Sequence, residues 1–283
     1  MSTSEPVAIT VGGHRTRLKW HRARKQAADA PFTTSRIVEG MRVGASVEVD
    51  LLIHGATAGH PRGFAVLHDR TLDAATTGVG TVRAASATYL RSLHLRDNDG
   101  HPVPAPVLLL DDLSTHLTDI HPDALLQLDF KQSAADLDDA VVTAFADAVE
   151  SFAPQAILSC GDADAVRILT DAVPRIRVGY DPCHHGAVDR VLRWRRYRHF
   201  VESAVAASPR ADTIYLDKRL VLTAADRGVD LIDQFHTAAR QVDIYTFTHE
   251  DDPGIIRALE LHPDQLTTDD PVGVADRFRA PTT

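Results

Sequence analysis

Short apolar runs alternate with longer amphipathic segments along most of the chain, and this alternation limits the fold more than any other feature of the sequence. Eight of the runs have the length and pattern of β-strands, and they span Arg17–Trp20, Ser46–Ile53, Leu125–Phe130, Ala156–Ser159, Arg175–Gly179, Thr213–Leu216, Val242–Phe247 and Gln265–Thr267. Between them, apolar residues recur at spacings of three and four, which indicates helices at Thr33–Val43, Ala135–Phe152, Asp162–Ala172, Arg219–Arg227, Leu231–Arg240 and Asp252–Leu261. Strand–helix repeats of this kind build a parallel sheet.

The number of strands distinguishes a closed barrel from an open sheet. Eight strand–helix repeats are what a (β/α)8 TIM barrel requires, and a chain of 283 residues is typical of that fold. An open doubly wound sheet would normally carry a Gly-x-Gly-x-x-Gly turn after a strand, and the sequence has none. We therefore expect an α/β protein, a single TIM-barrel domain over residues 1–283 with flexible tails at both ends.

The segment of residues 55–112 is too long for a simple crossover after the second strand. It contains a further apolar run at Phe64–Leu67 and a short helical pattern at Ala85–Leu95, and its glycines and prolines supply turns. We interpret this segment as a short insertion over one mouth of the barrel.

Charge and cysteine content limit the partners and the compartment. The formal net charge of -9 and the pI near 5.9 argue against general nucleic-acid binding, because that needs a basic face. The two cysteines form no disulfide framework, and neither a signal-peptide pattern nor an apolar run of membrane-spanning length is present in the sequence. We expect a cytoplasmic protein with a small-molecule substrate, no nucleic-acid partner and no integral membrane segment, and we leave a homo-oligomer open.

Two acidic residues of the second strand, Glu48 and Asp50, carry the clearest chemical signal. Residues two apart on a strand project to the same side, so both carboxylates face the barrel interior or its mouth. Burying like charges together is costly unless a cation lies between them, and a hard divalent cation is the usual compensation. The alternative is a half-exposed strand whose acids face water.

The third strand adds another carboxylate. Asp129 and Lys131 share a face near the end of this strand, and the C-terminal ends of barrel strands meet at one mouth, where the active sites of this fold lie. We therefore predict that Glu48, Asp50 and Asp129 bind one divalent cation.

Two histidines reach the same mouth in this arrangement. The first strand ends in His21-Arg22, which offers an imidazole that titrates near neutral pH and a planar guanidinium suited to phosphate. The apolar run of the insertion ends in His68-Asp69, where the carboxylate can orient the ring and the ring can serve as acid or base. Each pair, taken alone, is also compatible with a surface position or a turn.

In this order and spacing, the motifs resemble the glycerophosphodiester phosphodiesterase family, and the resemblance covers nearly the whole chain. The family opens with His-Arg-Gly, then Pro-Glu-Asn-Thr, then Glu-x-Asp, then His-Asp followed by Leu-x-x-Thr-Thr-x-Gly-x-Gly. The matching segments here are His21–Ala23, Pro31–Thr34, Glu48–Asp50 and His68–Gly80. Later segments resemble the family's Glu-x-Lys strand, Trp-Thr-Val-Asn strand and Ile-Thr-Asp-x-Pro turn, and they are Leu128–Lys131, Ile244–Thr248 and Leu266–Pro271.

The resemblance implies a (β/α)8 barrel that binds Mg2+ or Ca2+ through Glu48, Asp50 and Asp129. It also implies a reaction in which a hydroxyl of the substrate attacks phosphorus and expels an alcohol. Water then opens the cyclic intermediate and leaves a phosphomonoester. The substrate implied is a small glycerophosphodiester.

The resemblance further implies roles for side chains around the metal. Two histidines, His21 and His68, would be the general base and the general acid, and Arg22 and Lys131 would bind the phosphate. Tyr245 stands where the family usually has tryptophan, in the pocket for the substrate.

Four departures from the family pattern bear on function. Ala23 replaces glycine, Phe32-Thr33 replaces Glu-Asn, Asp129 replaces glutamate and Tyr245 replaces tryptophan. The lost Glu-Asn pair leaves open a catalytically weakened barrel that binds phosphorylated ligands, and the altered pocket leaves open a sugar phosphodiester or a lysophospholipid as substrate. An amidohydrolase-type barrel is disfavoured because the first strand lacks His-x-His.

Two further segments carry reactive or basic side chains. We interpret Asp181–Gly186 as a loop with incidental histidines, with substrate contact as the alternative, and a second metal site is disfavoured because a thiolate is a soft ligand. Arg193–His199 is the only strongly basic and aromatic run, and we interpret it as the solvated face of a helix. Recognition of an anionic substrate, a membrane surface or a partner is left open for this run.

Overall fold

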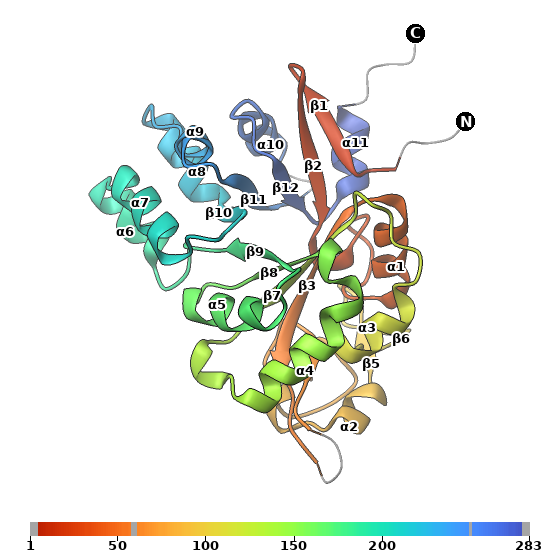
Figure 1. The fold of residues 1–283 in the computed structure, drawn as a ribbon. Coiled ribbons are helices and arrows are strands. Elements are labelled where there is room, and N and C mark those ends of the chain that lie inside the picture. The colour runs from red at the N-terminus through yellow and green to blue at the C-terminus, as the bar shows by residue number, and fades with distance from the viewer. Residues whose placement is uncertain (1–4, 58–60, 249–250, 279–283) are drawn as a thin grey trace.

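The computed structural model describes residues 5–57, 61–248 and 251–278, which form a closed barrel of parallel strands surrounded by helices (Figure 1). The main sheet has ten strands, and without the two antiparallel ones, β1 (Ala8–Val11) and β4 (Phe64–Val66), eight remain. In barrel order these are β2 (His14–Trp20), β3 (Ser46–Ile53), β7 (Leu125–Phe130), β8 (Ala156–Ser159), β9 (Arg177–Tyr180), β10 (Thr213–Asp217), β11 (Gln241–Phe247) and β12 (Gln265–Thr268). β12 pairs in parallel with β2 and closes the barrel, which confirms the predicted (β/α)8 fold. The terminal tails expected at residues 1–4 and 279–283 lie outside the described residues.

The central strands are buried along their length, as a sheet covered on both faces requires. Every residue of β3 is buried. Its outward side chains pack under helix α1 (Thr34–Val43), where Val47 lies so close that a Cβ added to Gly40 would be 2.5 Å from Val47 Cγ2. Because side chains alternate along a strand, Glu48 and Asp50 therefore point into the barrel.

Six helices cover the strands at the predicted places, and they are α1, α4 (Asp139–Val149), α5 (Ala163–Ala172), α8 (Lys218–Asp226), α9 (Leu231–Thr237) and α10 (Asp252–Leu259). The helix predicted over Ala135–Phe152 was too long, because three helical segments occupy this region. A 3-10 turn, Ala134–Asp136, precedes α4, and Asp138 caps α4 by accepting a hydrogen bond from the backbone N–H of Val141. A second 3-10 segment, Glu150–Gln155, follows and contains a proline, which an α-helix interior does not tolerate.

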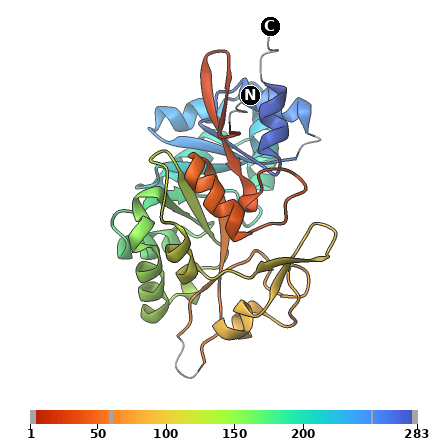
Figure 2. The same ribbon diagram turned by 90° about the vertical axis from the view of Figure 1, so that its right-hand side faces the viewer.

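The insertion after β3 has more structure than predicted. It lies to one side of the barrel, as the orange and yellow segments of Figure 2 show. It begins with β4, which pairs with β3, and it continues into α2 (Ala87–Arg91). The helix predicted over Ala85–Leu95 was too long, because the chain enters β5 (His94–Arg96), which forms a hairpin with β6 (Pro102–Pro106). Helix α3 (Leu110–His116) then returns the chain to the barrel.

The basic run Arg193–His199 does not lie on one helix, so that prediction was wrong. Helix α6 (Ala187–Trp194) ends at Arg195, whose φ of 53° is left-handed, and α7 (Tyr197–Ala207) begins two residues later. The last described helix is α11 (Pro271–Arg277). No helix in the described part of the chain is both long and apolar enough to cross a membrane.

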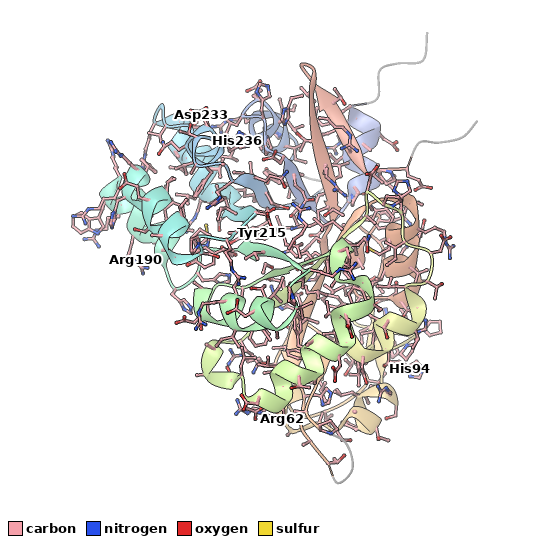
Figure 3. All side chains as sticks on the ribbon, in the orientation of Figure 1. Arg62, His94, Arg190, Tyr215, Asp233 and His236 are labelled. Atoms are coloured by element: carbon pink, nitrogen blue, oxygen red, sulfur yellow. The ribbon has the colours of Figure 1, made fainter. Side chains whose placement is uncertain are left out.

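Interior and surface positions separate clearly around the barrel. Figure 3 shows Tyr215 of β10 near the centre of the molecule, where its side chain is buried, whereas His94 and Arg190 lie at the periphery and are exposed.

Candidate active site

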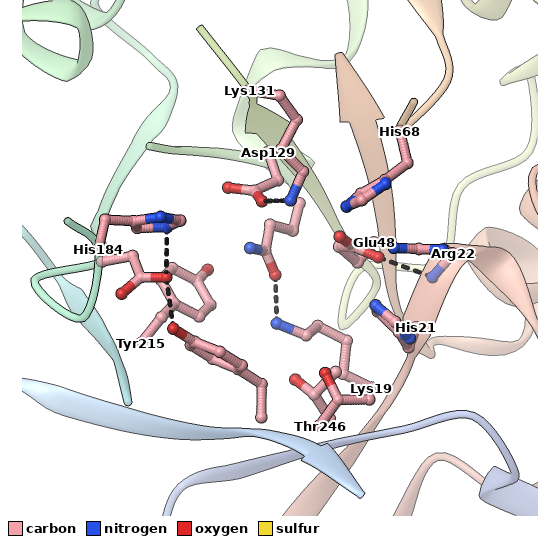
Figure 4. A pocket seen from close by; sticks show the side chains of 14 residues that line it. Lys19, His21, Arg22, Glu48, His68, Asp129, Lys131, His184, Tyr215 and Thr246 are labelled. Atoms are coloured by element: carbon pink, nitrogen blue, oxygen red, sulfur yellow. Dashed lines mark hydrogen bonds and ion pairs between the residues drawn. The ribbon is translucent and has the colours of Figure 1, made fainter. Parts of the chain in front are cut away.

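A cavity of about 250 Å³ opens at the C-terminal ends of the barrel strands (Figure 4). Its lining is mostly polar and consists of Lys19, His21, Arg22, Glu48, His68, Gln127, Asp129, Lys131, Asp181, His184, Tyr215, Tyr245, Thr246 and Thr267. Seven of the eight predicted site residues line this cavity. The eighth, Asp50, lies behind the wall and is fully buried.

Three carboxylates converge at one side of the cavity. Glu48 and Asp50 share the inner face of β3, and Asp129 on β7 lies directly opposite Asp50 in the register of the two strands. Each of the three offers an oxygen within 4.8 Å of the others. An arrangement of three acids this close, two of them buried, needs positive charge nearby.

Two basic side chains supply part of that charge. The ammonium of Lys131 lies 2.7 Å from Asp50 Oδ1 and also bonds Asp129, and Arg22 Nε lies 3.4 Å from Asp50 Oδ2. Burial works against the ammonium, yet Asp129 and Asp50 outweigh it and raise the pKa of Lys131 above its ordinary value. The backbone N–H of Arg22 donates to Glu48 Oε2 at 2.7 Å.

Asp50 is nevertheless incompletely satisfied. Both of its oxygens are buried, and neither has a hydrogen bond of good geometry within the described residues, although both lie within ion-pair distance of a cation. Burial, and then the charge of Glu48, raise the pKa of Asp50 to about 7. Three carboxylates, one of them incompletely satisfied, suit a hard divalent cation, so these residues fit the metal that the sequence motifs imply.

His21 is held in a sharp turn after β2. Its neighbours Arg22 and Ala23 have φ of 53° and 58°, so Ala23 adopts the left-handed conformation that glycine would adopt more readily. The ring bonds Asp269 Oδ1 through Nδ1 at 2.6 Å, which leaves Nε2 for the cavity. Burial outweighs Asp269 and lowers the pKa of His21, which favours the neutral ring.

His68 enters the cavity from the insertion. Its Nδ1 lies 2.8 Å from Asp69 Oδ1, which is the orienting contact that the sequence suggested. Figure 4 shows the rings of His68 and His21 on either side of Glu48.

The opposite wall joins Tyr245, which the sequence motifs placed in the substrate pocket, to Asp181 and His184, which had no assigned role. Tyr245 donates its hydroxyl to Asp181 Oδ2 at 2.8 Å, and His184 Nε2 lies 2.9 Å from the same oxygen. The hydrogen bond to Asp181 raises the pKa of His184 and favours the imidazolium. The interpretation of the histidines of Asp181–Gly186 as incidental therefore does not fit His184, which lines the cavity.

A buried polar network forms the floor of the cavity. Lys19 lies 2.9 Å from Asp243 Oδ2 and also bonds Gln127. Gln127 donates to the Ser159 hydroxyl at 2.8 Å, and that hydroxyl donates to Asp129 Oδ1 at 2.6 Å. This chain of contacts links the floor to the carboxylates. Its members come from four different strands, so no local sequence motif marked the network.

The segment that replaces the family's Glu-Asn pair packs beneath the His21 turn. Phe32 is buried, has a left-handed φ of 60° and donates its backbone N–H to the carbonyl of Arg22 at 2.8 Å. An apolar ring therefore stands at this position instead of a carboxylate.

No model of a known protein family matches the sequence, and no curated protein matches it either. Solved structures do match. The fold is a (β/α)8 barrel of the kind seen in glycerophosphodiester phosphodiesterase structures. A structure from Agrobacterium tumefaciens assigned as a glycerophosphoryl diester phosphodiesterase superposes with a TM-score of 0.68 at 22% identity, covering 93% of this chain and 97% of the other.

Two further structures agree. A glycerophosphodiester phosphodiesterase from Agrobacterium tumefaciens gives a TM-score of 0.64 at 19% identity, over 92% of this chain and 99% of the other. An Oleispira antarctica phosphodiesterase, solved with its product sn-glycerol-3-phosphate, gives 0.63 at 15% identity, over 92% of this chain and 95% of the other. At these identities the likeness establishes the shared barrel fold, and that fold is the one the sequence motifs imply.

Proposed function

We propose that this protein is a member of the glycerophosphodiester phosphodiesterase family and hydrolyses a small phosphodiester to an alcohol and a phosphomonoester. The observation that carries the proposal is the cluster of Glu48, Asp50 and Asp129 at the wall of one small cavity, which the ring of His21 also lines. The fold shared with solved phosphodiesterases supports it.

Glu48, Asp50 and Asp129 would hold one divalent cation, Mg2+ or Ca2+. When bound, the cation stabilises negative charge on the phosphoryl oxygens and acidifies the attacking hydroxyl. Arg22 and Lys131 lie beside the same carboxylates and would contact phosphate oxygens as the charge develops.

Proton transfer falls to the two histidines. His21, kept neutral by burial and fixed by Asp269, accepts the proton of the attacking hydroxyl at Nε2. His68, oriented by Asp69, donates a proton to the oxygen of the departing alcohol. The P–O bond to the alcohol breaks as the new P–O bond forms. Water then opens the cyclic phosphodiester to a phosphomonoester, with the two rings exchanging roles.

The wall made by Asp181, His184 and Tyr245 would receive the substrate's hydroxyl groups. Its donors and acceptors already bond one another, and they line a cavity large enough only for a small polar group beside the phosphate. A glycerophosphodiester suits this wall, and a sugar phosphodiester is the nearest alternative. A lysophospholipid would have to extend its acyl chain beyond the cavity.

Turnover tests the proposal directly. Purified protein with Mg2+ or Ca2+ is given glycerophosphocholine, glycerophosphoethanolamine, glycerophosphoglycerol and glycerophosphoinositol, and the released alcohol is measured with and without a chelator. We expect metal-dependent release that His21→Ala and Asp50→Asn each reduce by at least about 100-fold. His101→Ala, on the exposed hairpin turn, serves as the matched control and should keep full activity. Release that survives the chelator or His21→Ala would contradict the mechanism.

One observation favours a second function. The buried Phe32 ring removes a carboxylate from the His21 turn, and a barrel weakened in this way would bind phosphorylated ligands without cleaving them. Calorimetric titration with sn-glycerol 3-phosphate separates the two. Binding that depends on Lys131, together with no turnover of any phosphodiester, would favour the binding protein.

A further inference from the structure

Five arginines gather on the α6–α7 helix pair, outside the active-site cavity. Residues 190–199 contain no acidic side chain, although the whole chain has a net charge of -9. All five arginines are exposed, and we call them the arginine cluster: Arg190, Arg193, Arg195, Arg196 and Arg198. Figure 1 shows α6 and α7 at the outer edge of the barrel, and Figure 3 labels Arg190 there.

Little of this charge is neutralised by the protein. Within residues 5–57, 61–248 and 251–278, only Arg198 of the cluster has an ion pair. Its partner is Glu202 at 2.8 Å, and both side chains are exposed. Arg190 donates to the backbone carbonyl of His185, which carries no charge. A strongly positive surface on an acidic protein calls for an anionic partner.

An exposed tryptophan stands in the middle of the cluster. Trp194 ends α6 with 63% of its surface exposed, and the guanidinium of Arg193 lies 5.1 Å from its ring centroid. The other tryptophan of the chain, Trp20, is fully buried. Tryptophan flanked by cationic side chains is typical of segments that lie at a membrane–water interface, where the ring enters the headgroup region.

The surface beside the cluster is hollowed and partly apolar. A groove of about 530 Å³ lies between α6 and α7, with Val191, Phe200 and Ala204 in its lining and Arg190 and Arg196 among its polar residues. Cations and an exposed tryptophan next to a partly apolar groove match an anionic amphiphile, which offers both charge and hydrocarbon.

We propose that the α6–α7 pair docks the protein on the surface of an anionic phospholipid bilayer. The arginine cluster contacts lipid phosphates, Trp194 lies in the headgroup region, and the groove shelters hydrocarbon of a bound lipid. The docking is peripheral and independent of the proposed phosphodiesterase activity. Each arginine near such a surface strengthens binding by about fivefold, so the cluster is sufficient for reversible association.

Tryptophan fluorescence measures the proposed contact with the bilayer. Trp20 is already buried, so we expect only Trp194 to change its environment when vesicles bind. The full chain is titrated with anionic vesicles, which contain phosphatidylglycerol and phosphatidylcholine, and with neutral vesicles of phosphatidylcholine alone. Binding is measured in parallel by co-sedimentation. We expect a blue shift and co-sedimentation with the anionic vesicles only, both weakened by added salt. Trp194→Phe removes the fluorescence change but keeps most of the sedimentation.

Charge reversal provides the decisive comparison. The Arg193→Glu/Arg195→Glu double variant should lower the vesicle partition coefficient by more than about tenfold. Arg42→Glu, at an exposed position on α1, should lower it less than about threefold, and equal thermal midpoints show that each variant is folded. Equal loss with Arg42→Glu, equal binding to neutral vesicles, or no blue shift of Trp194 would overturn the proposal. Tighter binding of the parent to a single-stranded oligonucleotide than to vesicles would also overturn it.

Discussion

The buried ion pair between Lys19 and Asp243 gives the most demanding test of the structure. The two side chains are 2% and 0% exposed and lie 2.9 Å apart. Asp243 also accepts hydrogen bonds from Thr267 at 2.6 Å and from Gln265. Asp243→Asn keeps the shape but places an amide N–H2 or a neutral oxygen beside an ammonium that is almost fully buried at the floor of the cavity.

The expected loss follows from the uncompensated charge. Removing one member of a buried pair costs about 3–5 kcal/mol of unfolding free energy, because the remaining ion stays desolvated. For a chain of this size the corresponding fall in the thermal midpoint is about 2–4 °C per kcal/mol, so at least about 6 °C. Denaturant titration with a fixed m-value measures the free energy, and calorimetry measures the midpoint.

Two companion variants show whether the charge is the cause. Adding Lys19→Met to Asp243→Asn removes the stranded ammonium and should restore more than half of the loss. Glu202→Gln breaks the exposed pair with Arg198 and should cost less than about 0.5 kcal/mol. An Asp243→Asn protein within about 1 kcal/mol of the parent, or a double variant no more stable than the single one, would refute the reasoning.

The remaining predictions concern pH and local backbone conformation. Burial holds the pKa of His21 below its ordinary value of 6.5, so the acidic limb of kcat/KM should have its midpoint below that pH. Asp269 acts in the opposite direction and raises this pKa, so Asp269→Asn should lower the midpoint further. A midpoint that shifts to higher pH in the pH–rate profile would contradict the assignment of His21 as the base. Ala239 follows α9 with a left-handed φ of 55° and is exposed, so Ala239→Gly should raise the free energy of unfolding by about 0.5–1 kcal/mol, which thermal denaturation measures; destabilisation would contradict the backbone conformation.

The strands were predictable because burial leaves short runs rich in apolar residues, or alternating with them, in the sequence. β3, β7 and β8 have the predicted bounds, and the remaining barrel strands differ from their predicted bounds by at most three residues. Helix ends were harder to predict, because a single cap or a left-handed residue decides them. Asp138 at the start of α4 and Arg195 at the end of α6 are examples.

The candidate site was predictable where residues two apart on one strand carry the chemistry, as with Glu48 and Asp50. It was not predictable where the partners come from distant strands. Lys19 and Asp243 meet only because β2 and β11 flank β12 in the closed barrel. The contact of Asp181 with Tyr245 likewise joins the end of β9 to the end of β11, across β10.

The pairing of β12 with β2 has a consequence for how the site assembles. His21 and Asp269 are 248 residues apart in the sequence, and their contact forms only after the last strand has joined the first. A chain shortened before β12 would keep Glu48, Asp50 and Asp129 on neighbouring strands yet would have no partner for the His21 ring. In the proposed mechanism, the orientation of the His21 ring therefore depends on the pairing of β12 with β2, whereas the three carboxylates come from the adjacent strands β3 and β7.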